Sequence, residues 1–152
     1  ELSEKLSEIL SDKLYQIIGA AMEVHKVLKS GLLEPIYQEA LAVELKEREI
    51  PFEREKLLET FYKGHRLNKF YRTDFVCYDD IIIELKAVEK VLSEHRAQLF
   101  NYLRLLKKPV GVIINFGEKS LYSEKYFYDE EQNRCFIINS AMKLDNKIIV
   151  SN

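Results

Sequence analysis

Three of the five charged residues in one stretch of the chain stand among apolar residues that favour strands. Asp74 lies near the start of TDFVCYDDIIIELKA (residues 73–87), and Glu84 and Lys86 lie near its end. In an extended strand, residues two apart share a face, so Glu84 and Lys86 point to the same side. Charges in a buried strand are costly unless they are paired, bind a metal or perform chemistry. The stretch is therefore a candidate reactive site.

The chemistry open to these residues is that of a divalent metal ion. Neighbouring carboxylates repel one another unless a cation lies between them, and hard oxygen ligands suit Mg²⁺ or Mn²⁺. Such an ion lowers the pKa of a water that it binds and polarises a phosphoryl group. Lys86 could hold the attacking water or offset charge that develops at phosphorus. The set is sufficient for phosphodiester hydrolysis, although the spacing taken alone favours an ordinary solvent-facing ion pair.

The site requires Asp74 to lie opposite Glu84 in an antiparallel hairpin. A two-residue turn would place Asp74 opposite Leu85, on the wrong face of the sheet. A three-residue loop, with Cys77 opposite Ile81, would place Asp74 opposite Glu84. We predict this second register, or a bulge with the same effect. Without it the argument for a metal site at these residues fails.

Hydrophobic periodicity predicts the elements that position this stretch. The predicted helices cover residues 3–29, 34–48 and 93–107, and the predicted strands cover 52–62, 67–77, 80–88 and 110–117. The pattern leaves undecided whether the first helix breaks near Ser11. In the second helix Ile36, Ala40 and Val43 are expected to face the core, with Leu41 and Leu45 as further candidates. The residues beyond 118 could form one or two further strands or edge structure. We expect one α/β domain over residues 1–152.

Bulk composition limits the classes of function. The net charge of −2 gives no global attraction to nucleic acid, so any such attraction must come from a local patch or from metal ions. Two cysteines cannot form a four-thiolate metal site, and they fit a reducing, cytoplasmic setting. No segment approaches the ~20 apolar residues of a membrane span, so no membrane partner is expected.

Three further polar residues have suitable positions. Gln98 and Tyr102 are four apart, so they share one face of the predicted helix over 93–107. Gln98 could reach a phosphate or a water at the metal, and Tyr102 could contact a nucleic-acid backbone. Glu34 begins a helix, where it could interact with the helix dipole or add a third acidic group to the site. Each of these residues, taken singly, also has an ordinary structural reading.

Together these residues resemble the GxxExxY proteins. The segments that carry the resemblance are GLLEPIYQEAL (31–41), YKG (62–64), YRTDFV (71–76), IELKA (83–87), QLFNYL (98–103) and GVIINFG (111–117). They occur in the order of that family and span about residues 14–117, most of the chain. The GxxExxY group is placed in the PD-(D/E)XK nuclease superfamily. The resemblance implies a restriction-endonuclease-like α/β core of helix, three strands, helix and strand, with an N-terminal helical extension.

The resemblance also implies roles for the site residues. By motif position, the matching catalytic residues are Glu34, Asp74, Glu84, Lys86, Gln98 and Tyr102, and the matching metal ligands are Glu34, Asp74, Glu84 and the carbonyl of Leu85. The implied activity is Mg²⁺- or Mn²⁺-dependent hydrolysis of nucleic acid, DNA favoured, by a single chain, a homodimer or a larger complex. The alternative is a catalytically silent module of the same fold that binds nucleic acid or protein. Thr73 departs from the motif, which has proline there.

The histidines and a basic stretch leave alternatives open. His25 is a candidate metal ligand by analogy with some relatives, but packing against the helix is the favoured reading. His95 could lie at the edge of the site. His65 belongs to a basic stretch that could contact phosphates or form a solvated edge hairpin. The other members of that stretch are Lys63, Arg66, Lys69 and Arg72.

Overall fold

The structure, a computed structural model, describes residues 2–141 and 143–150, with side chains over 10–141 and 143–145. The helices are α1 (Leu2–Leu28), α2 (Glu34–Glu47) and α3 (Ser93–Leu106). The strands are β1 (Phe52–Arg54), β2 (Leu57–Tyr62), β3 (His65–Arg72), β4 (Phe75–Cys77), β5 (Ile81–Lys86), β6 (Val110–Asn115), β7 (Tyr122–Asp129), β8 (Arg134–Ile138) and β9 (Leu144–Val150). Within the described part of the chain, no helix is long and apolar enough to cross a membrane.

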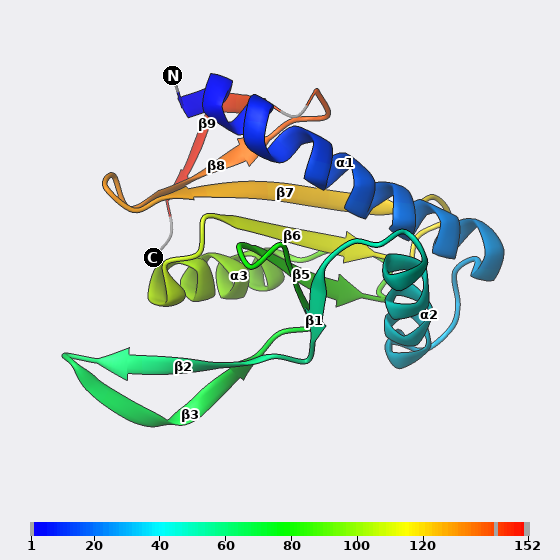
Figure 1. Cartoon of the computed structure of the whole chain (residues 1–152), viewed down its shortest axis with the longest axis horizontal. Helices are drawn as coiled ribbons and strands as arrows, with labels where there is room; N and C mark the ends of the chain where they lie inside the picture. The colour runs from blue at the N-terminus through cyan, green and yellow to red at the C-terminus, as the bar shows by residue number, and fades with distance from the viewer. Residues whose placement is uncertain (1, 142, 151–152) are drawn as a thin grey trace.

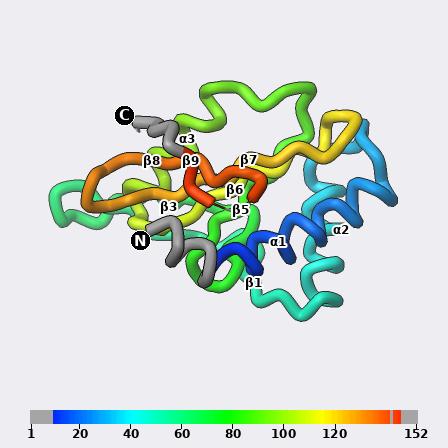
Figure 2. Tube along the Cα trace, turned by 90° about the horizontal axis from the view of Figure 1, so that it is seen from above, coloured from blue at the N-terminus to red at the C-terminus, as the bar shows by residue number. Residues whose placement is uncertain are grey.

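A seven-stranded sheet forms the centre, in the order β1-β4-β5-β6-β7-β8-β9. Its one parallel pair is β5 with β6, and α3 makes the crossover that a parallel pair requires. Helices α1 and α3 lie on opposite faces of the sheet (Figure 1). Helix α2 packs beside α1 at one end of the molecule (Figure 2). Of the five strands between α2 and α3, three belong to this sheet: β1, β4 and β5. The expected core order of helix, three strands, helix and strand is thus confirmed for the main sheet, with α1 as the N-terminal extension.

The central strand β5 is covered on both faces. Ile81, Ile83 and Leu85 belong to the hydrophobic cluster under α1, and Ile82 belongs to the cluster under α3. Glu84, two residues after Ile82, therefore lies on the α3 side of the sheet. A strand so enclosed needs apolar residues at nearly every position, which explains the run III.

The predicted register of β4 and β5 is confirmed. Cys77 lies opposite Ile81, and Phe75 lies opposite Ile83. The pairing ends at Phe75, and the residue before it, Asp74, lies in a bend. One more step along the same register brings Asp74 opposite Glu84, as the site requires.

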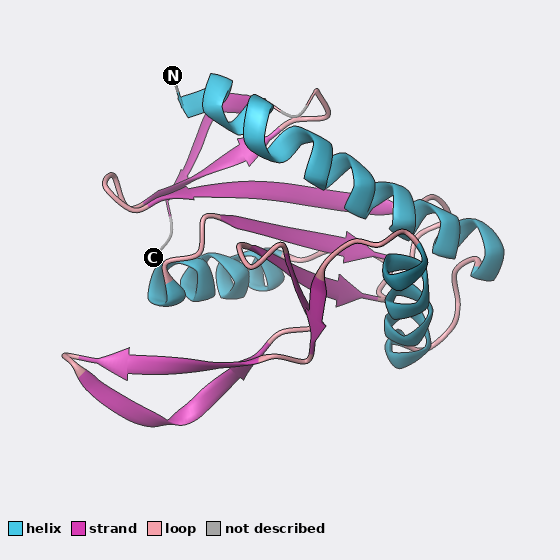
Figure 3. Cartoon of the chain, viewed as in Figure 1, coloured by secondary structure: helices cyan, strands magenta, loops and turns pink. Residues whose placement is uncertain are grey.

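The predicted strands over 52–62 and 67–77 were wrong as continuous strands. Each breaks in two, and β2 and β3 leave the main sheet to form a separate two-stranded hairpin (Figure 3). Glu55 takes a left-handed conformation, with φ of 52°, which turns the chain after β1. Backbone hydrogen bonds of 3.0 Å from Glu55 to Asp74 and from Thr73 to Lys56 hold the two bends together. Both halves keep strand-forming residues, so the sequence pattern does not reveal the bend.

The helices and the tail also depart from expectation. Helix α1 runs without a break at Ser11. In α2, Ile36 and Val43 are exposed rather than inward, while Leu41 and Leu45 are buried. The residues after 118 form three strands rather than one or two. Strand β9 was missed because its short apolar run becomes recognisable as a strand only through its pairing with β8.

The turn between α1 and α2 determines where α2 begins. Gly31 has φ of 106°, a conformation that glycine adopts without strain. The buried Tyr37 hydroxyl donates to the Lys29 carbonyl at 2.5 Å and accepts from the Leu32 amide at 3.1 Å. The Tyr37 ring stacks on Phe116, with centroids 4.6 Å apart. The first turn of α2 is thereby fixed against the sheet.

The loop after β5 is held by one buried side chain. The Asn115 amide oxygen accepts from the Val88 and Gly117 amides, each at 3.0 Å. Its amide nitrogen donates to the Val88 carbonyl and to Glu118, each at 2.9 Å. The segment that leaves β5 is therefore tied to the end of β6.

Gly117→Ala is expected to lower the unfolding free energy by about 3 kcal/mol or more. A Cβ at this position would clash with backbone atoms of Ala87 and Val88, which cannot move without breaking the Asn115 hydrogen bonds. Chemical denaturation measures the loss. The matched control is Gly19→Ala, whose Cβ would lie 3.4 Å from Arg48. That change should be neutral or stabilise by up to about 1 kcal/mol, and equal effects at both glycines would contradict this account.

Candidate functional site

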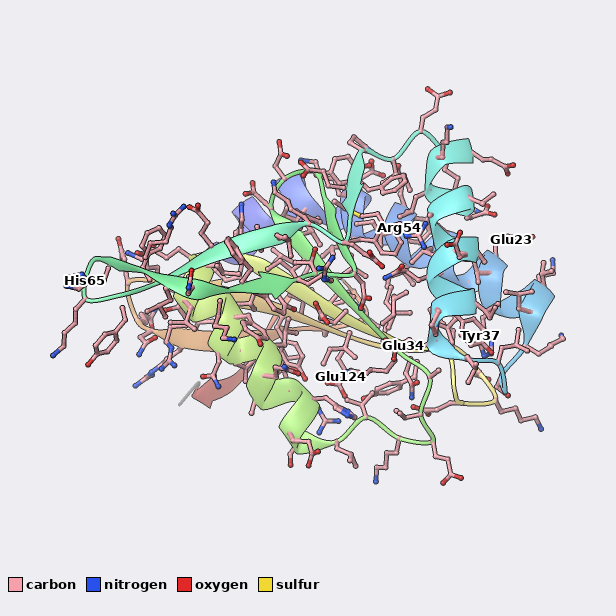
Figure 4. The ribbon with its side chains drawn as sticks, turned by 90° about the horizontal axis from the view of Figure 1, so that it is seen from below. Glu23, Glu34, Tyr37, Arg54, His65 and Glu124 are labelled. Carbon is pink, nitrogen blue, oxygen red and sulfur yellow. The ribbon has the colours of Figure 1, made fainter. Side chains whose placement is uncertain are left out.

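The structure brings four of the predicted site residues together. Glu34 lies at the first turn of α2 (Figure 4), Asp74 in the bend before β4, and Glu84 and Lys86 on β5. The Asp74 Oδ2 atom accepts a hydrogen bond of 2.8 Å from the Leu85 amide. Electrostatic interactions link Glu84 with Glu34, Asp74 and Lys86. All four charged side chains are half-buried.

Asp74 is held by a chain of hydrogen bonds from α2 and β1. The buried Gln38 donates from Nε2 to Asp74 Oδ1 at 2.8 Å. The Gln38 Oε1 atom in turn accepts from Arg54 Nε at 3.0 Å, and Arg54 also pairs with Glu39 at 2.6 Å. The other oxygen of Asp74 accepts from the Leu85 amide, so each oxygen of this carboxylate accepts a hydrogen bond. Sequence reasoning missed Gln38, although it directly follows the tyrosine of the GLLEPIYQEAL segment.

Glu84 is held by a tyrosine that sequence reasoning also missed. The buried Tyr71 hydroxyl donates to Glu84 Oε2. The Tyr71 ring stacks on Tyr102, with centroids 3.5 Å apart. Gln98 donates to the Tyr102 hydroxyl at 3.3 Å. Gln98 and Tyr102, the two residues predicted on α3, are thus connected to the carboxylates through Tyr71. The only sequence signal for Tyr71 is its place in YRTDFV.

Burial disfavours the charged forms of all three carboxylates. It is the main cause that raises the pKa of Glu84 to about 8, and the neighbouring Asp74 and Glu34 raise it further. Hydrogen bonding from Tyr71 and the charge of Lys86 act in the opposite direction. The pKa values of Asp74 and Glu34 are also raised, again mainly by burial. The site therefore has more negative charge than the surrounding protein stabilises.

The carboxylates are near one another without forming a ready-made metal cage. Among the residues whose side chains are described, no three His, Cys, Asp or Glu side chains are arranged to hold a metal ion. Asp74 and Glu84 are instead hydrogen-bonded to Gln38 and Tyr71. Carboxylate oxygens have several acceptor positions, so these bonds leave lone pairs for a cation.

The histidines take other places. His25 Nε2 is hydrogen-bonded to the Glu118 carbonyl at 2.9 Å, and the His25 ring lies beside that of Phe116, in agreement with the packing reading. His95 Nδ1 accepts from the Leu92 amide at 3.0 Å, which caps the start of α3. His65 lies at the tip of the β2–β3 hairpin, at the end that is remote from Arg54 and Glu34 (Figure 4).

A cavity of about 510 Å³ lies between α3, β7 and β8, and none of the three carboxylates lines it. At its wall Glu124 accepts from Arg96 Nε and Nη2 at 2.7 and 2.6 Å. The hydroxyls of Tyr122 and Tyr126 also donate to Glu124, at 2.5 and 2.6 Å. These polar groups satisfy one another, so the acidic residues at β5 remain the candidate site.

Comparison with known proteins gives a family and a fold. Residues 11–126 match the family model described as the PD-(D/E)XK nuclease superfamily. The solved structure described as "Crystal structure of SSO0001" is similar at a TM-score of 0.50 and 23% identity, over 65% of this chain and 53% of that chain. This chain therefore matches about half of that protein's length, and the likeness concerns the fold alone. No curated protein matches the chain.

Glu84→Gln is expected to flatten the pH dependence of stability in metal-free protein. With a folded pKa of about 8 against an ordinary 4.5, Glu84 keeps a proton that the unfolded chain has released between these values. The unfolding free energy should thus fall as pH rises through this window, by up to about 1.4 kcal/mol per pH unit from this group. Urea denaturation in EDTA from pH 5 to 8 measures the slope. The control is Glu47→Gln on the exposed end of α2, and equal slopes for wild type and Glu84→Gln would contradict the assignment.

Gln38→Glu is expected to lower the unfolding free energy at pH 7 by about 2 kcal/mol. The change replaces the donor to Asp74 with a second carboxylate in a buried position. Gln16→Glu is the matched control, because Gln16 also donates to an aspartate, Asp12, at 2.9 Å but on an exposed helix face. It should cost less than about 0.5 kcal/mol. Thermal denaturation of both variants tests the contrast, and similar losses would show that the Gln38–Asp74 bond has no special weight.

Proposed function

The chain belongs to the PD-(D/E)XK nuclease superfamily, and on this basis we propose that it hydrolyses phosphodiester bonds of nucleic acid, DNA favoured, with Mg²⁺ or Mn²⁺. One observation carries the proposal: Asp74 and Glu84 interact beside Lys86 on the α3 side of β5. A site with this composition has the groups for metal-assisted hydrolysis. A family match alone would carry only the fold.

The donor set fits a divalent cation. Three half-buried carboxylates face one lysine, and burial raises the pKa values of all three. The charge of Asp74 raises the pKa values of Glu34 and Glu84 further. Two added positive charges would offset that excess. In this proposal Asp74, Glu84 and the Leu85 carbonyl hold the ion, with Glu34 as a further acidic group. The Leu85 amide points to Asp74, and the N–H and carbonyl of one strand residue point to the same side, which supports the carbonyl assignment.

In this proposal the side chains around the carboxylates have separate roles in hydrolysis. The metal ion, when bound, supplies Lewis acidity and an activated water. Lys86 orients the attacking water and stabilises negative charge on the transferring phosphoryl group. Gln38 and Tyr71 hold Asp74 and Glu84 in place through their hydrogen bonds. Gln98 and Tyr102, on the α3 flank, contact the phosphate backbone of the substrate.

The same proposal includes the finer assignment to the GxxExxY group. The structure gives each signature residue a distinct task that supports it. Gly31 provides the left-handed turn, and Tyr37 fixes that turn by two hydrogen bonds. Glu34 then begins α2 with its side chain next to the other carboxylates. The motif thus delivers one acidic group from a rigid helix start.

Lys86→Ala is expected to lower metal-dependent cleavage by about 100-fold or more, because it removes the group that stabilises charge at phosphorus. Cleavage of labelled DNA and RNA in Mg²⁺, Mn²⁺ or EDTA measures the loss. Lys46→Ala, on the exposed last turn of α2, is the matched control and should cut like wild type. Titration calorimetry with Mn²⁺ follows the ion directly, and Asp74→Asn should weaken its binding at least tenfold while Lys46→Ala does not.

The outcomes separate the two candidate functions. Cutting that persists in EDTA would overturn the metal requirement. Absence of both cutting and Mn²⁺ binding would overturn the nuclease proposal and favour a catalytically silent binding module of the same fold. The hydrogen bonds that already occupy Asp74 and Glu84 are the observation in favour of that alternative.

A further inference from the structure

The β2–β3 hairpin exposes an unusual set of side chains. It stands apart from the seven-stranded sheet (Figure 3). Five of its large hydrophobic residues are between 41% and 60% exposed: Leu57, Phe61, Tyr62, Leu67 and Phe70. Three of the five are aromatic. A solvated structural hairpin has no need of exposed rings, so the surface suits a partner.

The hairpin is also basic in an otherwise acidic protein. Residues 57–72 carry four Lys or Arg and one Glu, against 23 and 25 for the whole chain. Removal of the hairpin residues from the count leaves 19 basic against 24 acidic residues. The positive charge is therefore local, and a polyanion would be drawn to this surface.

The two faces of the hairpin differ in whether their basic side chains form ion pairs. Arg66 and Arg72 form ion pairs with Glu59 and Glu55 at 3.0 and 3.8 Å. By strand alternation Lys69 lies on the other face, the one that carries Tyr71. Lys69 has no acidic partner among the side chains that the structure describes. The free positive charge is thus on the Tyr71 face.

This face leads from the tip of the hairpin to the acidic residues. The register of the two strands shifts between Glu59 and Phe61. Tyr62 still shares this face, because it pairs with His65, and both lie an even number of residues from the Leu58–Tyr71 pair. Lys63 lies over the Tyr62 ring, 5.4 Å from its centroid. At the base of the hairpin the Tyr71 hydroxyl meets Glu84. Cations and one exposed ring therefore lie on this face within about 20 Å of the candidate site. At its base the face is covered by α3, because Tyr71 is buried against Tyr102.

We propose that the hairpin binds single-stranded nucleic acid and leads it to the acidic site. In this arrangement a base stacks on Tyr62, and Lys63 and Lys69 contact phosphates. Stacking on a protein ring requires an unpaired base, because a duplex hides the base faces. The inference rests on the proposed function and narrows its substrate class to single strands or unpaired segments.

The test is a binding measurement in EDTA, where cleavage is not required. Fluorescence anisotropy compares a labelled 20-nucleotide single strand with the duplex of the same sequence. The single strand should bind at least tenfold tighter. Tyr62→Ala should weaken its binding about 5- to 100-fold. Lys69→Gln should reduce the slope of log affinity against log salt by about 0.7.

Matched controls lie on surfaces away from the hairpin. Tyr15→Ala removes a ring that is 72% exposed on α1, and Lys46→Gln removes an exposed lysine on α2. Both should bind the single strand like wild type. Unchanged melting temperatures would show that all four variants remain folded.

Two results would overturn the inference: duplex binding as tight as single-strand binding, or wild-type affinity in both Tyr62→Ala and Lys69→Gln. The comparison with cleavage separates this inference from the proposed function. Single-strand binding that needs Tyr62, without any cutting in Mg²⁺ or Mn²⁺, would support the hairpin and count against the nuclease. If wild type cuts nucleic acid and the hairpin variants bind and cut like wild type, the nuclease proposal would be supported and the role of the hairpin would be contradicted.

Discussion

The Leu85 amide donates to the Asp74 carboxylate at a point where a neighbouring strand would ordinarily supply a backbone carbonyl. Strand β4 ends at Phe75, so β5 continues beyond its partner, and a buried amide there must find another acceptor. The side chain of Asp74 takes that role. The need to satisfy one backbone group thus holds a carboxylate against the strand that carries Glu84 and Lys86, and the arrangement of the site depends on it.

The bend that contains Asp74 joins the acidic site to the protruding hairpin. Backbone hydrogen bonds across the bend close the β1–β4 pair on one side and the β2–β3 pair on the other. Tyr71 contacts Glu84 from the end of β3, just before the bend, and Gln38 reaches Asp74 from α2. Because the same few residues end one sheet and begin the other, the position of the hairpin and the position of the carboxylates are determined together.

The charges of the site lower the stability of the folded state. Buried carboxylates with raised pKa values weaken the folded state near neutral pH unless protons or cations compensate them. Lys86 supplies one positive charge, and the hydrogen bonds from Gln38 and Tyr71 supply partial compensation. Proteins usually depart from the rules of stability at functional sites. The concentration of such departures around β5, rather than around the self-satisfied Arg96–Glu124 pair, is the physical argument for function there.

Local sequence patterns were enough to predict the core order of helices and main-sheet strands up to β6, the shared face of Glu84 and Lys86, and the β4–β5 register. Helix periodicity, strand alternation and turn length act over a few residues. The resemblance in the sequence motifs also indicated the superfamily. Three features became visible only in the folded chain: two strands bend apart, Gln38 and Tyr71 hold the carboxylates, and Tyr37 rather than Ile36 is buried. These features depend on contacts between residues far apart in the chain, which local sequence patterns do not predict. A glutamine or tyrosine looks the same in sequence whether it faces water or a buried acid, and only folding places its partner beside it.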